Sequence, residues 1–440
     1  MLGLDGVRGL TIAFSDMNGI TRSRTVPFAK FEDAVERGVG ITSLFPVFTS
    51  TDGITFGHEP LSTPSGDLRL CATHDRVRRL AGQPAFAWTP GRQFEQDGSR
   101  SMYCQRHALE RQIEAAAAMG LEVQAGYELE WFIGHADAEL SPAHHGPVYG
   151  PLAMLEVDEF CAQLLADLDA NGILVGQLHA EYGLAQMELA ISPNDPLAAA
   201  DMQLLARQTI HAAARAHGLR ASFAPLVTPD TAGNGWHAHS SVLRDGENLL
   251  AGGDRRHGLT AEGEAWLAGL VRELPALAAI ASPSLPSLLR RRPGYFASAY
   301  AFWGVQNREA SLRFMPETTL VPANAANIEL KASDASGNPY LTLASIISAG
   351  LAGIAEGLTL PEPINVDPGS WSEVEREQRG IALLPTTTEQ QIAAVEGSLP
   401  VRDALGEPLF GAWSAVRSAD ASWAKGKTPE EIVTRHRWSY

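Results

Sequence analysis

The segment Tyr127-Glu128-Leu129-Glu130-Trp131-Phe132 places two carboxylates in an otherwise apolar, strand-like run. Side chains at positions i and i+2 of a strand point to the same face, so Glu128 and Glu130 should lie side by side. Two carboxylates at that separation repel each other unless a positive charge lies between them. A divalent metal ion is the simplest source of that charge, so the segment predicts a strand at the centre of a metal site.

Other strand-like segments, far apart in the chain, carry the same kinds of residue. His237-Ala238-His239 has the spacing that puts both imidazoles on one face of a strand. Glu181 and Glu188 flank a Tyr-Gly turn between two short strands, so a hairpin would bring both carboxylates to one place. Each pattern taken alone is more typical of a solvated surface, because charged residues are usually exposed. Their joint occurrence favours a functional site.

Two arginines and a further glutamate extend this set. Arg308 and Arg313 follow Trp303 in a strand-rich region. The guanidinium group is suited to bidentate recognition of phosphate or carboxylate, although surface salt bridging is an equally ordinary role for such residues. Glu329 begins a spaced pattern that continues with Asp334 and with Asn338-Pro339-Tyr340.

The composition narrows the possible partners and the compartment. A formal net charge of -17 argues against a nucleic acid or an anionic membrane as partner, since neither tolerates a negative surface without a basic patch. The dense basic run is short, Arg290-Arg291-Arg292. The chain has 3 cysteines without metal-ligand spacing, so neither a disulfide framework nor a zinc knuckle is expected. A reducing cytoplasm fits these features.

The order of the expected elements predicts two domains. A hairpin over residues 9–28, a helix over 28–36 and short strands over 67–71 and 84–89 indicate a small sheet with one helix. The charged stretch 93–102 then predicts a boundary, with an N-terminal domain over 1–98 and a larger domain over 99–440. Strands and helices interleave without a regular βαβ period, which favours an α+β fold over a doubly wound sheet.

The larger domain is expected to mix long helices with strands. Helices are predicted over 105–119, 158–171, 196–217, 260–280 and 339–357, strands over 122–133, 177–181, 185–191, 220–225, 237–243, 300–314 and 326–332, and a mostly helical tail from 386. The most apolar run, 341–355, is shorter than the roughly 20 residues that span a bilayer. It contains glycines and serines, so we expect a buried helix there.

The motifs, taken together and in order, resemble the glutamine synthetase family. They are ExE, ExxxxxxE, HxH, R-x-x-P-G, NR-x4-R and E-x4-D-x3-NPY, and the resemblance runs from Asp16 to about Gly357. Trp303-Gly304 before Asn307-Arg308 is similar to the branch that joins glutamate to larger amines, such as γ-glutamylpolyamine and γ-glutamylethanolamide synthetases. The resemblance implies an N-terminal β-grasp domain, a larger catalytic domain, and dodecamers of two hexameric rings with active sites between neighbouring subunits.

The resemblance also implies roles for individual residues. ATP and two or three Mg²⁺ or Mn²⁺ ions per active site are expected. The implied metal ligands are Glu130, Glu181 and Glu188 for one ion and Glu128, His237 and Glu329 for another. His239 and Ser241 are expected to touch ATP, Arg308 and Arg313 to clamp its phosphates, Arg308, Arg313 and Glu188 to serve catalysis, and Gly233, Arg290, Phe296 and Lys331 to bind the substrates.

The implied reaction has two steps. The side-chain carboxylate of glutamate takes the γ-phosphoryl group of ATP, and an amine nitrogen then displaces phosphate from the acyl phosphate. Phosphoryl transfer depends mainly on positioning and on stabilisation of charge, which metal ions and arginines supply. The acyl phosphate must also be kept from water until the amine arrives.

The sequence departs from the ammonia-using members at the acceptor side. Phe296 stands where those members carry a glutamate that shields the intermediate and helps bind ammonium, and residues 44–48, Leu-Phe-Pro-Val-Phe, replace an Asp-Gly-Ser. Both changes remove negative charge and add apolar surface. We therefore expect poor use of ammonia and an acceptor amine with a carbon chain. Asn327 and Lys331 stand where arginines are common, which leaves the identity of the acid open.

Three hypotheses follow. The first is a cytoplasmic, ATP-dependent ligase that joins the γ-carboxylate of glutamate to a polyamine or to a small amino alcohol such as ethanolamine, without a nucleic-acid or membrane partner. The second is a glutamine synthetase that uses ammonia. The third is a catalytically inactive, ring-forming paralogue that binds nucleotide without turnover; the presence of every expected metal ligand argues against it.

Overall fold

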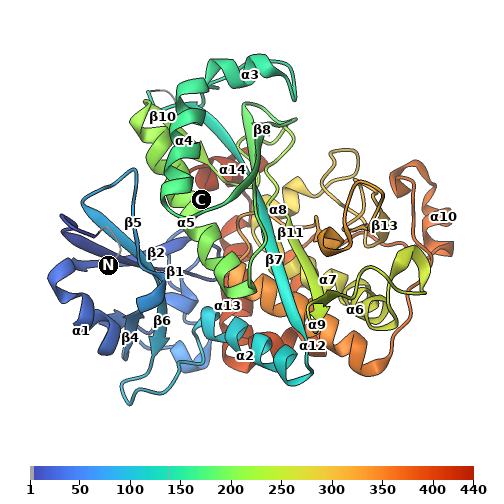
Figure 1. Ribbon diagram of the computed structural model, residues 1–440, viewed down its shortest axis with the longest axis horizontal. Coiled ribbons are helices and arrows are strands. Elements are labelled where there is room, and N and C mark those ends of the chain that lie inside the picture. The colour runs from blue at the N-terminus through green and yellow to red at the C-terminus, as the bar shows by residue number, and fades with distance from the viewer. Residues whose placement is uncertain (1–3, 138) are drawn as a thin grey trace.

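Two β-sheets organise the chain in the computed structural model, which describes residues 4–137 and 139–440 (Figure 1). The first sheet is built from the N-terminal part of the chain and the second from residues 122–330. Residues 1–3 of the predicted N-terminal domain and residue 138 lie outside the described residues. The boundary after residue 98 stays a prediction.

The first sheet begins with the predicted hairpin. Strands β1 (Gly9–Ser15) and β2 (Thr21–Pro27) pair antiparallel, and the carboxylate of Asp16 closes the turn by accepting from the backbone nitrogen of Asn18 at 2.8 Å. In the described chain the strand order is β2-β1-β6-β4-β3, with β3 (Val39–Thr42), β4 (Asp67–Ala72) and β6 (Phe86–Phe94), while β5 (Arg78–Arg79) pairs with β6. Helix α1 (Phe31–Glu36) packs on β4.

The second sheet is centred on β7 (Glu122–His135), the long strand that runs through the middle of Figure 1. Among the described residues the strand order is β13-β14-β15-β11-β7-β9-β8, with β10 paired to β7 and β12 paired to β11. The bounds are β8 (Val175–Ala180), β9 (Gln186–Ile191), β10 (Leu219–Ser222), β11 (Ala238–Arg244), β12 (Glu247–Asn248), β13 (Trp303–Val305), β14 (Leu312–Met315) and β15 (Asn327–Leu330).

Helices cover this sheet and form the C-terminal tail (Figure 1). Their bounds are α2 (Gln105–Ala118), α3 (Pro151–Glu156), α4 (Asp158–Ala170), α5 (Pro196–Ala216), α6 (Ala261–Arg272), α7 (Leu274–Ala281), α8 (Leu285–Arg290), α9 (Pro339–Glu356), α10 (Glu373–Gln378), α11 (Thr388–Gly397), α12 (Leu399–Leu405), α13 (Glu407–Ala424) and α14 (Pro429–His436). The predicted α+β class is confirmed, and so is the mostly helical tail.

Helix α9 is the buried helix that the apolar run predicted. The side chain of Asn338 caps its first turn, and Gly357 ends it in the left-handed region at φ 63°. It is the one helix in the described chain that is long and apolar enough to cross a membrane, yet 72% of its length is buried in the fold. Small residues allow close packing on α6, because a Cβ on Gly353 would lie 2.1 Å from the carbonyl oxygen of Ala265.

Two expected elements differ from the structure. The helix predicted over 260–280 is two helices, α6 and α7, because Pro275 in the first turn of α7 starts a new helix. The strand predicted over 300–314 is two short parallel strands, β13 and β14, separated by a turn with Gln306 at φ 53°. Helices α3, α8 and α10 were not predicted; each has 6 residues, too few for a helical period to show.

Enlarging Gly353 tests the close packing of α9 on α6. We expect Gly353→Val to lower the free energy of unfolding by about 1–3 kcal/mol, because the new side chain has no space against the backbone of α6. The urea midpoint measures the change. Gly397→Ala is the control, because a Cβ there meets open space. An unchanged midpoint for Gly353→Val would contradict the packing described.

Candidate active site

The register of the second sheet brings acidic and basic side chains from several strands onto one face. Glu130 of β7 lies directly opposite Glu188 of β9, and Glu188 lies opposite His179 of β8. Residues directly opposite on neighbouring strands place their side chains on the same face. Since Glu128 is two residues from Glu130, its side chain shares this face, as the sequence predicted.

The other half of the sheet continues the same row. Arg313 of β14 lies opposite Glu329 of β15, and Glu329 lies opposite His239 of β11. His239 in turn pairs with Gly126 of β7, two residues before Glu128. Segments more than two hundred residues apart in sequence therefore meet because of strand pairing alone.

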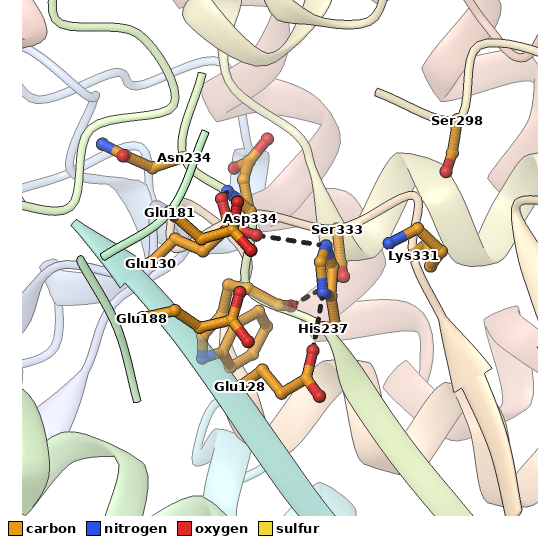
Figure 2. Close-up of polar contacts among 12 residues, drawn as sticks. Glu128, Glu130, Glu181, Glu188, Asn234, His237, Ser298, Lys331, Ser333 and Asp334 are labelled. Carbon is orange, nitrogen blue, oxygen red and sulfur yellow. Dashed lines mark hydrogen bonds and ion pairs between the residues drawn. The ribbon is translucent and has the colours of Figure 1, made fainter. Parts of the chain in front are cut away.

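The first acidic group consists of Glu128, His237 and Glu329, whose ligand atoms all lie within 4.8 Å of one another. His237 Nδ1 is 3.0 Å from Glu128 Oε2 and 3.3 Å from Glu329 Oε1. Figure 2 shows the imidazole between the carboxylates, with Glu128 and Glu130 both reaching toward it from β7. The structure thus brings together the three residues expected to share one metal ion.

Positive charges balance this first group. Glu329 is 1% exposed, and it lies 3.0 Å from Arg313 and 3.4 Å from Lys331. Burial acts to raise the pKa of Glu329, but the charges of Lys331 and the neighbouring histidines outweigh it and hold that pKa below its ordinary value. Burial likewise acts to raise the pKa of Glu128, and the hydrogen bonds from His237 and His239 reverse it. Both carboxylates are therefore ionised at neutral pH.

The second acidic group consists of His179, Glu181 and Glu188, with ligand atoms again within 4.8 Å. His179 Nε2 lies 3.5 Å from Glu181 and 3.8 Å from Glu188. Burial, followed by repulsion from Glu130 and other carboxylates, raises the pKa of Glu188 to about 10. Glu188 therefore keeps a proton at neutral pH, because its protein neighbours do not balance a negative charge there.

Glu130 links the two groups without belonging to either set of close ligand atoms. Its Oε2 accepts hydrogen bonds from the backbone nitrogen of Gly235 and from Gln186 Nε2, each at 2.7 Å. Its Oε1 lies 3.5 Å from His237 Nε2. A Cβ on Gly235 would lie 2.7 Å from that Oε1 and 2.6 Å from His237 Nε2, so only glycine fits there.

The donor atoms of both groups suit hard divalent cations. Such ions prefer carboxylate oxygen and accept imidazole, and each group offers two carboxylates and one histidine. The raised pKa of Glu188 also points to a cation site. Burial and repulsion make this carboxyl keep a proton, and a bound cation would take the place of that proton. Bound there, divalent ions would neutralise phosphate charge and orient phosphate oxygens.

A cavity of about 250 Å³ adjoins the first group between β7, β11 and the segment before β15. Its lining includes Glu128, His239, Ser241, Asn324 and Asn327. Burial acts to lower the pKa of His239, but the hydrogen bond to Glu128 outweighs it and raises that pKa to about 9. The two residues expected to touch ATP therefore line a cavity next to the acidic groups.

Two of the residues expected to bind the substrates, Gly233 and Arg290, pack against each other. Arg290 is 4% exposed and donates to the carbonyl oxygen of Ser333 at 3.1 Å, while its Nε has no hydrogen-bond partner among the described residues. A Cβ on Gly233 would lie 2.8 Å from Arg290 Cδ, so glycine lets the backbone approach the arginine. Lys331 points toward Glu329, as its ion pair requires.

Phe296 and Arg308 lie toward solvent. Phe296 is 61% exposed and adopts φ 52°, a left-handed conformation uncommon for a non-glycine residue. Arg308 is also exposed and makes no ion pair with any of the described residues. The structure brings Arg313, but not Arg308, into contact with the acidic groups.

Sequence reasoning missed three residues at this site. His179 precedes Glu181 by two residues, which is the same-face spacing that singled out the other pairs, so its signal was present. Gln186 orients Glu130, and the hydroxyl of Tyr149 hydrogen-bonds to Glu181. Neither Gln186 nor Tyr149 has a sequence signal, because each acts through tertiary contact.

Comparison with known proteins agrees with this geometry. Residues 102–434 match the model of the glutamine synthetase catalytic domain. The chain belongs to the glutamine synthetase family. It is 42% identical over 439 residues to gamma-glutamylpolyamine synthetase GlnA3 of Streptomyces coelicolor, covering 99% of this chain and 94% of that protein. It is 29% identical to glutamine synthetase of Methanosarcina mazei, covering 92% of this chain and 89% of that protein.

A solved structure gives the same assignment for the fold. The structure described as a novel glutamine synthase homolog superimposes with a TM-score of 0.88 at 29% identity, covering 99% of each chain. Members of the glutamine synthetase family use ATP and divalent metal ions, in keeping with the acidic groups found here. The family resemblance and the fold expected from the sequence are thereby confirmed, whereas the roles of individual residues stay predictions.

Replacing Glu188 by glutamine tests the charge balance of the second group. A carboxyl group whose pKa is raised on folding favours folding below its unfolded pKa of about 4.5, and the benefit is lost as the pH rises toward about 10. We expect Glu188→Gln, with a chelator at pH 8, to melt about 2–4 °C above the native protein. The difference should shrink as the pH falls toward 4.5.

Metal ions should stabilise the native protein more than the Glu188→Gln variant. Mn²⁺ should raise the melting temperature of the native protein more than that of Glu188→Gln, because the variant has lost an anionic ligand. Differential scanning fluorimetry with and without chelator measures both effects. A variant that melts below the native protein in chelator at pH 8, or responds to Mn²⁺ equally, would contradict the assignment.

Proposed function

We propose that the protein is an ATP-dependent ligase that joins the γ-carboxylate of glutamate to an amine with a carbon chain, with a polyamine as the preferred acceptor. The observation that carries this proposal is the combination of an intact family site with an exposed phenylalanine, Phe296, in the loop after R-x-x-P-G. The relative from S. coelicolor, 42% identical, is named as a γ-glutamylpolyamine synthetase.

We propose that Mg²⁺ or Mn²⁺ is held by Glu128, His237 and Glu329 and a second ion by Glu181 and Glu188. Glu130 lies between the two groups and would supply a further carboxylate to the second ion. His179 is a further candidate donor, because it shares the group with Glu181 and Glu188.

The protein's own residues account for binding and orientation. His239 and Ser241 would contact the nucleotide in the cavity beside β11, and Arg313 would stabilise phosphate charge from the neighbouring strand. Arg290, with an unpartnered Nε, would hold the acid next to Gly233. Glutamate is the acid we propose, with Lys331 supplying the positive charge that an arginine supplies in many relatives.

Arg308 is the proposed phosphate clamp without an ion pair to the acidic groups, although its charge acts on Tyr149, which hydrogen-bonds to Glu181. Because its side chain is exposed and without an ion pair among the described residues, it is free to turn toward phosphate when nucleotide binds. We also propose the cytoplasm as the location and the family's dodecamer of two hexameric rings as the assembly. In such rings a neighbouring N-terminal domain would complete each site.

Two alternatives remain distinguishable. A glutamine synthetase that uses ammonia is disfavoured because Phe296 has no acidic group to hold ammonium. A catalytically inactive paralogue is disfavoured because both acidic groups keep their full set of donors. The acceptor amine separates all three hypotheses in one experiment.

Release of phosphate from ATP should require glutamate and an amine together. We expect activity with putrescine, spermidine or spermine, weaker activity with ethanolamine, and little with methylamine or ammonium. Coupled phosphate assays measure the rates, and mass spectrometry identifies the γ-glutamyl product. Glu188→Ala is the inactive control. Ammonium as the best acceptor would point to glutamine synthetase, and no turnover with any amine would point to the inactive paralogue.

Restoring an acidic group at Phe296 should shift the acceptor. We expect Phe296→Glu to raise kcat/KM for ammonium about tenfold, because a charged hydrogen bond to the acceptor is restored. Phe296→Gln, of the same size but uncharged, is the matched control and should gain much less. Equal gains in both variants, or none in either, would contradict a role for the missing charge.

A further inference from the structure

Two exposed aromatic rings stand together at the edge of the second acidic group. Tyr182 is 53% exposed and Phe296 is 61% exposed, and their rings meet edge to face with centroids 5.9 Å apart and an interplanar angle of 60°. Phe296 also holds a left-handed backbone conformation, which costs free energy in a non-glycine residue. Rings that are held outward in this way contribute little to the core, so a binding role is the better explanation.

The chain ties this aromatic pair to the acidic group. Tyr182 follows Glu181 directly, and its backbone nitrogen donates to Glu181 Oε2 at 2.6 Å. Glu188, in the same group as Glu181, is only 8% exposed. A molecule that reaches the buried carboxylates from solvent on this side therefore passes the two rings.

The chemistry of the rings suits a cation on a carbon chain. An aromatic face attracts an ammonium group and packs against methylene groups, and it carries no formal charge. Carboxylates at the same place would compete with the acidic group for divalent metal ions, whereas rings do not. A diamine has one nitrogen that must be unprotonated to attack, while its other amine, with an ordinary pKa of roughly 10, stays charged near pH 7.

We propose that Tyr182 and Phe296 together bind the carbon chain and the distal ammonium group of a diamine or polyamine acceptor, and so select such acceptors over monoamines. This inference rests on the proposed ligase function and deepens it. The reacting end of the acceptor points toward the acidic groups, and its cationic end rests on the aromatic pair. Tyr182 thereby becomes a specificity-determining residue that no sequence motif marks.

The neighbouring Tyr295 provides an internal comparison. Its ring belongs to the same loop as Phe296, but the guanidinium of Arg292 lies 4.0 Å from its centroid. That face already holds a cation from the protein itself, so it has little to offer an acceptor. Tyr295→Leu is therefore the matched control for Tyr182→Leu and Phe296→Leu.

The test compares putrescine with butylamine, which has the same carbon chain but no second amine. The ratio of kcat/KM for putrescine to that for butylamine isolates the contribution of the distal ammonium. We expect a ratio of about 5–30 in the native enzyme, from the usual strength of a cation–π contact at a partly desolvated site. The ratio should fall to about 1–2 in Tyr182→Leu and Phe296→Leu, while Tyr182→Trp and Tyr295→Leu keep it.

The outcomes are distinguishable. Both kcat/KM values are measured on the same variant, so a general loss of activity or of folded protein lowers both equally and leaves their ratio unchanged. A native ratio that persists in both leucine variants overturns the aromatic pair as the binding site, and so does a native ratio near 1. If the native enzyme ligates no amine at all, the proposed function fails instead.

Discussion

Repulsion among buried carboxylates is the constraint on which this structure depends. Four carboxylates lie close together on one face of the second sheet, those of Glu128, Glu130, Glu188 and Glu329. The protein balances one end of the row, where Arg313 and Lys331 flank Glu329, and leaves the other end unbalanced at Glu188. Strand pairing fixes the backbone positions of these residues, so the carboxylates stay close together whether or not their charges are balanced.

The asymmetry explains how the site supports a ligase. The charge-balanced group beside the cavity is ionised without any ligand, whereas the raised pKa of Glu188 reflects a carboxylate whose charge lacks a balancing partner in the protein. Charge stabilisation and positioning are the main demands of phosphoryl transfer, and under the proposed function this acidic face would meet both by holding divalent ions. Under the same proposal the acceptor is selected farther out, where Phe296 is uncharged.

Much of this could be predicted from the sequence, and the failures have physical reasons. Same-face spacing paired Glu128 with Glu130 and His237 with His239, and the structure places both histidines beside Glu128, with His237 Nδ1 at 3.0 Å and His239 Nε2 at 3.3 Å. The position of Glu130 between two groups was not predictable, because Gly235 and Gln186 hold it through tertiary hydrogen bonds. The break between α6 and α7 could have been predicted from the sequence, because Pro275 lies in the first turn of α7. Contacts between loops, such as the one between Tyr182 and Phe296, leave no periodic signal.

In the proposed reaction the side-chain carboxylate of glutamate takes the γ-phosphoryl group of ATP, and the amine then displaces phosphate. Glutamate labelled with ¹⁸O in its side-chain carboxylate, incubated with ATP, Mn²⁺ and putrescine, tests this most directly by mass spectrometry of the released phosphate. We expect one ¹⁸O atom in phosphate for each γ-glutamyl amide formed, because the bridging oxygen of the acyl phosphate leaves with phosphorus. Amide formation with unlabelled phosphate would contradict it.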